Sequence, residues 1–128
     1  MRLLLDTHAF LWLGSSPEKI SSDALSAYRN PNNEIFLSLV SVWEIQIKEQ
    51  LGKLSLDVSL GKLLHEQRVR NITDFLPIRL SHILALKELP FHHKDPFDRL
   101  LISQAIQEEM TLVSSDAIFS EYPVSILW

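Results

Sequence analysis

The sequence contains no cysteine, only three glycines and no long uninterrupted apolar segment. The absence of cysteine excludes disulfide bonds and thiolate metal sites, which fits a reducing compartment. Three glycines are too few for a glycine-rich phosphate-binding loop. The apolar start, Met1 to Leu5, is interrupted by Asp6 and His8 before it reaches signal-peptide length, and no other stretch approaches the roughly 18 apolar residues of a membrane span. We therefore expect a soluble, cytoplasmic protein.

Positive charge is also scarce, because 12 Lys and Arg stand against 16 Asp and Glu, for a net charge of -4. Proteins that hold nucleic acid through bulk charge normally carry an excess of basic residues, so this class is disfavoured. A metal-dependent enzyme is not, because bound divalent ions reverse the sign of an acidic pocket. A basic middle section could follow a phosphate backbone, although a solvated helical face is the simpler explanation. It comprises Lys48, Lys53, Lys62, Arg68 and Arg70.

The pattern of elements predicts a single α/β domain over residues 1–128 rather than an all-helical bundle. Short apolar strands are expected at 2–6, 34–38, 111–114 and 124–127. A further strand at 75–78 would lie at an edge or an end, because Pro77 cannot donate a backbone hydrogen bond. Helices are expected at 8–13, 18–29, 40–51, 81–89 and 95–109, and from Leu60 to near Asn71.

The helix over 40–51 has the clearest periodicity. Val40, Trp43, Ile47 and Leu51 recur at helical spacing and predict one buried apolar face, with Gly52 as a left-handed C-cap. Aromatic side chains in this helix and elsewhere are most simply core residues rather than platforms for nucleic-acid bases. The aromatic residues assigned to the core are Trp12, Trp43, Phe97 and Phe119.

Two acidic residues follow predicted strands. Asp6 ends the first strand, and side chains there emerge at the carboxyl edge of the sheet, where α/β folds bind ligands. Alternatively, Asp6 caps the next helix, with Thr7 as a rival cap. Asp116 follows the strand at 111–114 and could instead be a turn residue that bonds its own backbone.

Two more acidic residues lie on predicted helices. Glu44 has apolar neighbours, although an exposed ion pair with Lys48 explains it equally well. Asp95 and Pro96 form a helix start, which leaves Asp98 as the better ligand and lets Asp95 hold a water or a second ion. If the four acids converge, their repulsion calls for a divalent cation such as Mg²⁺ or Mn²⁺.

Two adjacent histidines, His92 and His93, stand beside Asp95 and suggest a transition-metal site. No third imidazole occurs at a matching spacing, so we interpret the pair as part of a solvated loop.

Four segments in order resemble the PIN-domain ribonucleases, and more closely the VapC-like toxins of bacterial toxin–antitoxin pairs. They are LLDTH at 4–8, SVWEI at 41–45, HKDPFDRLL at 93–101 and TLVSSD at 111–116. The resemblance implies a three-layer α/β/α sandwich with a central, mainly parallel sheet and one acidic pocket. It further implies Asp6 and Asp98 as the principal metal ligands, completed by Glu44 and Asp116. Supporting positions are Asp95, Ser114, Arg99 and Thr7.

The same resemblance implies a Mg²⁺- or Mn²⁺-dependent endoribonuclease that acts as a toxin, forms a homodimer and is restrained by a cognate antitoxin. Two alternatives stay open at this point. The chain could be a PIN nuclease of RNA maturation or turnover without a toxic role. It could also be a non-catalytic module whose acidic pocket holds a structural cation or a partner's arginine.

Overall fold

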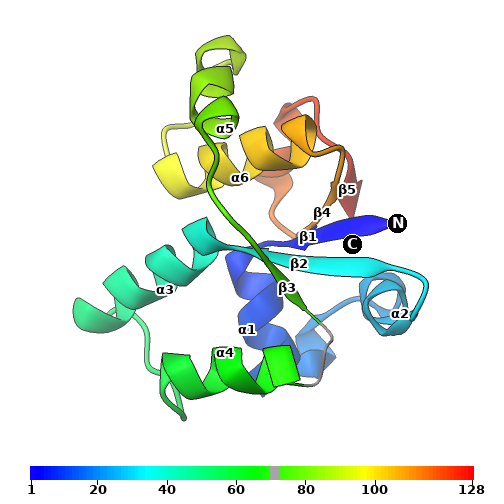
Figure 1. Ribbon diagram of the computed structural model, residues 1–128, viewed down its shortest axis with the longest axis vertical. Coiled ribbons are helices and arrows are strands. Elements are labelled where there is room, and N and C mark those ends of the chain that lie inside the picture. The colour runs from blue at the N-terminus through cyan, green and yellow to red at the C-terminus, as the bar shows by residue number, and fades with distance from the viewer. Residues whose placement is uncertain (70–72) are drawn as a thin grey trace.

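The computed structural model describes residues 1–69 and 73–128, and its centre is an all-parallel, five-stranded sheet (Figure 1). The strand order is β3-β2-β1-β4-β5, which places β1 in the middle and β3 and β5 at the edges. The mainly parallel sheet predicted from the sequence is confirmed. The strands are β1 (Arg2–Leu5), β2 (Glu34–Ser38), β3 (Asp74–Leu76), β4 (Thr111–Val113) and β5 (Ile126–Leu127).

The central strands end level with one another. Leu5, the last residue of β1, pairs with Leu37 on one side and with Val113 on the other. Parallel strands present their carboxyl ends at the same edge, so the residues that follow them are brought together. Asp6 comes next after β1 and Ser114 next after β4, and the Asp6 backbone N–H donates to the Val113 carbonyl over 3.1 Å.

Apolar side chains cover both faces of the sheet. Leu3 and Leu5 belong to one core cluster and Leu4 to another, because alternate residues of a strand point to opposite faces. Helices therefore form a layer on each side, with α5 and α6 on one side of the sheet and α1 and α4 on the other (Figure 1). The helices are α1 (Thr7–Ser15), α2 (Ser22–Arg29), α3 (Leu39–Gln50), α4 (Leu60–Val69), α5 (Leu80–Leu84) and α6 (Pro96–Gln107).

Two predicted helices are broken into shorter pieces. The stretch expected at 18–29 consists of a 3₁₀ turn, η1 (Pro17–Lys19), followed by α2, because the Ser21 hydroxyl accepts from the Ala24 N–H and starts a new helix. The stretch at 81–89 divides into α5 and η2 (Ala85–Glu88). The expected end of α4 near Asn71, like Arg70, lies outside the described residues. Within the described ranges, no helix is long and apolar enough to cross a membrane.

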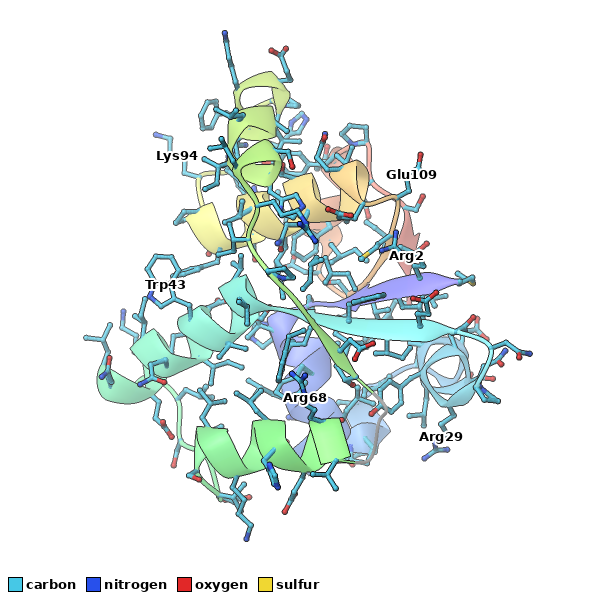
Figure 2. The ribbon with its side chains drawn as sticks, viewed as in Figure 1. Arg2, Arg29, Trp43, Arg68, Lys94 and Glu109 are labelled. Atoms are coloured by element: carbon cyan, nitrogen blue, oxygen red, sulfur yellow. The ribbon has the colours of Figure 1, made fainter. Side chains whose placement is uncertain are left out.

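The orientation of α3 differs from the prediction. Its buried residues are Val40, Ser41, Glu44 and Ile45, whereas two residues of the predicted buried face, Trp43 and Leu51, are 56% and 63% exposed. Figure 2 shows the Trp43 side chain projecting at the outside of the molecule. The assignment of Trp43 to the core was therefore wrong, because the helix turns a mixed polar and apolar face inward.

Other expectations for the helices and core are met. Gly52, just after α3, has a φ of +72°, as predicted for a left-handed C-cap. Phe119 is buried, and Trp12 and Phe97 are half-buried and pack against the two core clusters.

Candidate active site

Asp6 directly follows the carboxyl end of the central strand, β1, and is buried there. Its Oδ1 accepts from the Ala9 N–H over 2.7 Å, so it is the N-cap of α1, and Thr7 is not. Burial raises the pKa of Asp6, although hydrogen bonds from the Ser114 hydroxyl and the Ala9 N–H oppose that rise. Asp6 therefore caps α1 and also places a carboxyl group where little water reaches it.

Ser114 connects Asp6 to the fourth acid. Its hydroxyl oxygen accepts from the Asp116 N–H over 3.1 Å, while its side chain bonds to Asp6. Asp116 is exposed and caps η3 (Ala117–Glu121) by accepting from the Ile118 N–H over 3.1 Å. Asp116 therefore has the turn role that the sequence allowed. The negative charge of Asp116 also raises the pKa of Asp6 further.

Glu44 is buried, with 4% exposure, and both of its carboxylate oxygens have partners. Thr7 donates its hydroxyl proton to Oε1 over 2.6 Å, and Lys48 donates to Oε2 over 2.6 Å. The Thr7 hydroxyl oxygen also lies 3.0 Å from Ser41 Oγ. The ion pair with Lys48 considered from the sequence exists, but its acidic member is inside the protein rather than on the surface.

Asp98 lies in the first turn of α6. Asp95 is the N-cap of this helix and accepts from the Asp98 N–H over 3.0 Å, with Pro96 at the first helical position, so the predicted helix start is confirmed. Burial raises the pKa of Asp98 to about 6, and the charges of Asp95 and Glu44 add to the rise. A hydrogen bond from His93 acts in the opposite direction.

The electrostatic contacts between the acids fall into two groups, Asp6 with Asp116 and Asp98 with Asp95 and Glu44, and the acids do not form a closed cage. As placed in the described part of the chain, no three His, Asp or Glu side chains lie close enough together to hold a metal ion. Their oxygen donors suit Mg²⁺ and Mn²⁺, and Mg²⁺ commonly keeps several waters while binding one or two carboxylates. The donor chemistry and the mutual repulsion of Asp98 with Asp95 and Glu44 fit such an ion.

The comparison with protein families decides the family. Residues 3–124 match the model of the PIN domain. The chain belongs to the PIN domain family. PIN domains are nucleases that generally depend on divalent metal ions. No match was found among curated proteins.

Solved structures share this PIN fold at low sequence identity. VapBC2 of Rickettsia felis, bound to a DNA fragment from its promoter, aligns with a TM-score of 0.68 and 17% identity over 99% of this chain and 98% of that one. VapBC-1 of nontypeable Haemophilus influenzae aligns with a TM-score of 0.66 and 15% identity over 99% of this chain and 97% of that one. FitAcB of Neisseria gonorrhoeae aligns with a TM-score of 0.59 and 16% identity over 98% of this chain and 96% of that one.

A contact to Asp98 in this PIN domain was missed from the sequence. His93 is half-buried and its Nε2 lies 3.1 Å from Asp98 Oδ2, so its assignment to a solvated loop was wrong. Its Nδ1 lies 2.7 Å from the hydroxyl of Tyr122, which is 29 residues away along the chain. The two adjacent histidines beside Asp95 were the available signal, but nothing local pointed to Tyr122.

Arg99 bonds to the backbone of the loop that precedes α6. Its guanidinium donates to the Pro90 carbonyl over 2.7 Å and to the Leu89 carbonyl over 3.0 Å, and it stacks over the Phe91 ring at 4.0 Å. It also donates to the Tyr122 hydroxyl over 3.3 Å. Arg99 therefore fixes the loop that precedes α6, which is the segment that carries His93.

Proposed function

We propose that this PIN domain is a Mg²⁺- or Mn²⁺-dependent endoribonuclease that acts as the toxin of a toxin–antitoxin pair. The proposal depends on one observation above all. Asp6, directly after β1, and Asp98, in the first turn of α6, are acidic groups with raised pKa values, and each is under the influence of further carboxylates. Such a pair is costly to keep ionised without a cation. The likeness of the fold to the toxin–antitoxin structures VapBC2 and VapBC-1 supports the biological role.

In this proposal Asp6 and Asp98 hold the ion, and Glu44 and Asp116 complete its surroundings. A divalent ion at this position would supply a Lewis acid that lowers the pKa of a water and neutralises charge on the phosphodiester. Thr7 and Ser114 orient the acids by hydrogen bonds to Glu44 and Asp6. Lys48, next to Glu44, supplies a positive charge that also attracts the substrate phosphate.

Cleavage of RNA with and without metal tests the activity. Purified protein incubated with a structured RNA should produce internal cuts with Mg²⁺ or Mn²⁺ and none with EDTA. Asp98→Asn should abolish the cuts, whereas Asp57→Asn, which removes an equal charge from an exposed residue, should not. Cleavage that persists in EDTA, or in Asp98→Asn, would reject the proposal. Parallel expression in cells should show growth arrest with the wild type and normal growth with Asp98→Asn.

A groove beside α4 is the surface we assign to the antitoxin. It has a volume of about 400 Å³ and lies between the end of α1, residues 54–58 and α4. Its lining combines apolar and polar side chains, which suits an amphipathic segment of a partner. The apolar residues in its lining are Leu11, Leu13, Leu54, Leu56, Val58 and Leu63.

Co-expression with the product of the adjacent reading frame tests this assignment. Val58→Asp should weaken co-purification without affecting folding, because Val58 is 39% exposed. Val69→Asp is the matched control, because Val69 is 68% exposed and lies outside the groove lining. Equal retention of the partner by both variants would contradict the assignment. Failure to find any such partner while metal-dependent cleavage persists would favour a PIN nuclease of RNA maturation or turnover.

We also propose that the protein is a homodimer. Light scattering during size-exclusion chromatography of antitoxin-free protein should then give twice the mass of the 14.7 kDa chain. A monomeric mass across the accessible concentration range would contradict this.

A further inference from the structure

A chain of hydrogen bonds leads from the protein interior to the carboxylate of Asp98. Tyr122 is buried, with 4% exposure, and directly follows η3. Its hydroxyl oxygen lies 2.7 Å from Nδ1 of His93, and Nε2 of the same imidazole lies 3.1 Å from Oδ2 of Asp98. His93 therefore bridges a core tyrosine and a proposed metal ligand.

The partners of the tyrosine hydroxyl determine the direction of each hydrogen bond. The hydroxyl accepts from the backbone N–H of His93 over 3.1 Å and from Nη1 of Arg99 over 3.3 Å. A phenol has one proton and two lone pairs, so with both lone pairs occupied its proton points to Nδ1 of His93. Because Nδ1 accepts, the proton of the neutral imidazole is on Nε2. Nε2 then donates to Oδ2 of Asp98.

The surroundings hold this chain of residues in place. Arg99, which donates to the tyrosine, is itself fixed by the carbonyls of Leu89 and Pro90. The His93 and Tyr122 rings meet edge to face with centroids 5.4 Å apart, and the His92 ring also meets the Tyr122 ring edge to face, with centroids 4.9 Å apart. The donor offered to Asp98 is therefore part of a packed unit and not of a freely rotating side chain.

The two oxygens of the Asp98 carboxylate are left in different situations. Oδ2 accepts from His93, whereas Oδ1 receives no hydrogen bond from residues 1–69 or 73–128. We propose that Tyr122 and His93 are positioning residues, which fix the carboxylate through Oδ2 and leave Oδ1 to bind the divalent ion. This inference rests on the proposed metal-dependent function. Hydrogen bonds to the ligands of a metal typically change its affinity or the activity by about 10- to 100-fold when removed.

Calorimetric titration of the protein with Mn²⁺ tests the inference independently of cleavage. Tyr122→Phe removes only the hydroxyl and keeps the ring, so the packing with both histidines is retained. We expect this variant and His93→Ala to bind Mn²⁺ about tenfold more weakly than the wild type. His93→Gln should recover part of the loss, because its amide nitrogen can donate to Asp98. His92→Phe is the matched control and should bind normally, because His92 shares the ring contact without a bond to Asp98.

Nitrogen NMR of the histidine side chains adds a readout that does not depend on metal. The wild type should show His93 as the Nε2–H tautomer, and Tyr122→Phe should lose this preference. Normal Mn²⁺ affinity in Tyr122→Phe and His93→Ala, together with lost affinity in Asp98→Asn, would overturn the positioning role and leave the proposed function intact. Normal affinity in Asp98→Asn would overturn both. If His93→Ala does not fold, the Tyr122→Phe titration and the tautomer measurement decide the question.

Discussion

Thr7 and Glu44 join the exit of the central strand to helix α3 through a hydrogen bond of 2.6 Å between the threonine hydroxyl and Oε1 of the carboxylate. Both residues are buried. The contact therefore fixes one acid of the site relative to the strand that carries another, Asp6. It also satisfies a carboxylate oxygen that has little access to water, which makes the hydroxyl important for stability.

Thr7→Val should lower the free energy of unfolding by about 1–3 kcal/mol, because it preserves the shape of the side chain but leaves Oε1 of Glu44 without its donor. RNA cleavage should fall as well, because Glu44 is no longer oriented. Urea denaturation measures the first effect and the nuclease assay the second. Thr7→Ser keeps the hydroxyl and should behave much more like the wild type. A loss in Thr7→Ser without a loss in Thr7→Val would mean that the methyl group, and not the hydrogen bond, is what matters.

Metal-free stability should depend on pH through Asp98. Its folded-state pKa is raised to about 6, above the ordinary value near 4, so the folded protein binds more protons than the unfolded chain between these limits. The contribution of this group therefore becomes less favourable to folding as the pH rises through that window. Asp98→Asn removes the unfavourable charge, so in EDTA the variant should be more stable than the wild type at pH 7.5.

The difference between the two proteins should shrink as the pH falls toward 4, because the wild-type carboxyl group becomes protonated in both states. Urea denaturation at several pH values in EDTA measures it, and using the difference removes the effects of other titrating groups. Added Mn²⁺ should reverse the order at pH 7.5, since only the wild type retains the proposed ligand. A difference that is constant with pH would contradict the raised pKa.

Lys48 should compete with a divalent ion for Glu44. The ammonium lies 2.6 Å from Oε2, and this hydrogen bond raises the pKa of Lys48, with Asp95 and Asp98 adding to the effect. Lys48→Met should therefore bind Mn²⁺ several-fold more tightly at low salt, because about 1 kcal/mol of charge repulsion is removed when the charges are screened as in bulk water. The metal-free variant should be less stable, because the buried Glu44 loses its partner.

Calorimetry with Mn²⁺ at two ionic strengths measures this effect, which should weaken at higher salt. Lys53→Met is the control for the loss of one positive charge, since Lys53 is exposed just after α3. Unchanged or weaker Mn²⁺ binding by Lys48→Met would show that the lysine supports the site instead of competing for it.

Local sequence signals were sufficient for the sheet and for the start of α6. Consecutive leucines at 3–5 predict a strand buried on both faces, and the structure divides them between two core clusters. Asp95 followed by Pro96 predicts a helix start, which is found at that point. The strand end also predicts the position of Asp6 at the edge of the sheet. In each case the residues that determine the structure are neighbours along the chain.

Contacts between segments that are far apart in the sequence could not be predicted from local signals. Tyr122 and His93 lie 29 residues apart, and no spacing relates them. The inward face of α3 was also mispredicted, because periodicity favoured Trp43 while tertiary packing buries Glu44 and Ser41. The buried carboxylate of Glu44 is stabilised by hydrogen bonds from Thr7 and Lys48. The pair with Lys48 was expected from the spacing of four residues, whereas Thr7, 37 residues away, was not.

The orientation of α3 leads to a direct comparison between two of its residues. Ile45 is fully buried, so Ile45→Ala should lower the free energy of unfolding by about 2–5 kcal/mol. Trp43→Ala should lower it by only about 1 kcal/mol, because the indole is 56% exposed and its ring contact is with Phe97, at a centroid distance of 5.2 Å. Urea denaturation of dilute, purified protein measures both. A loss at Trp43 as large as at Ile45 would show that the tryptophan face of α3 is covered in solution.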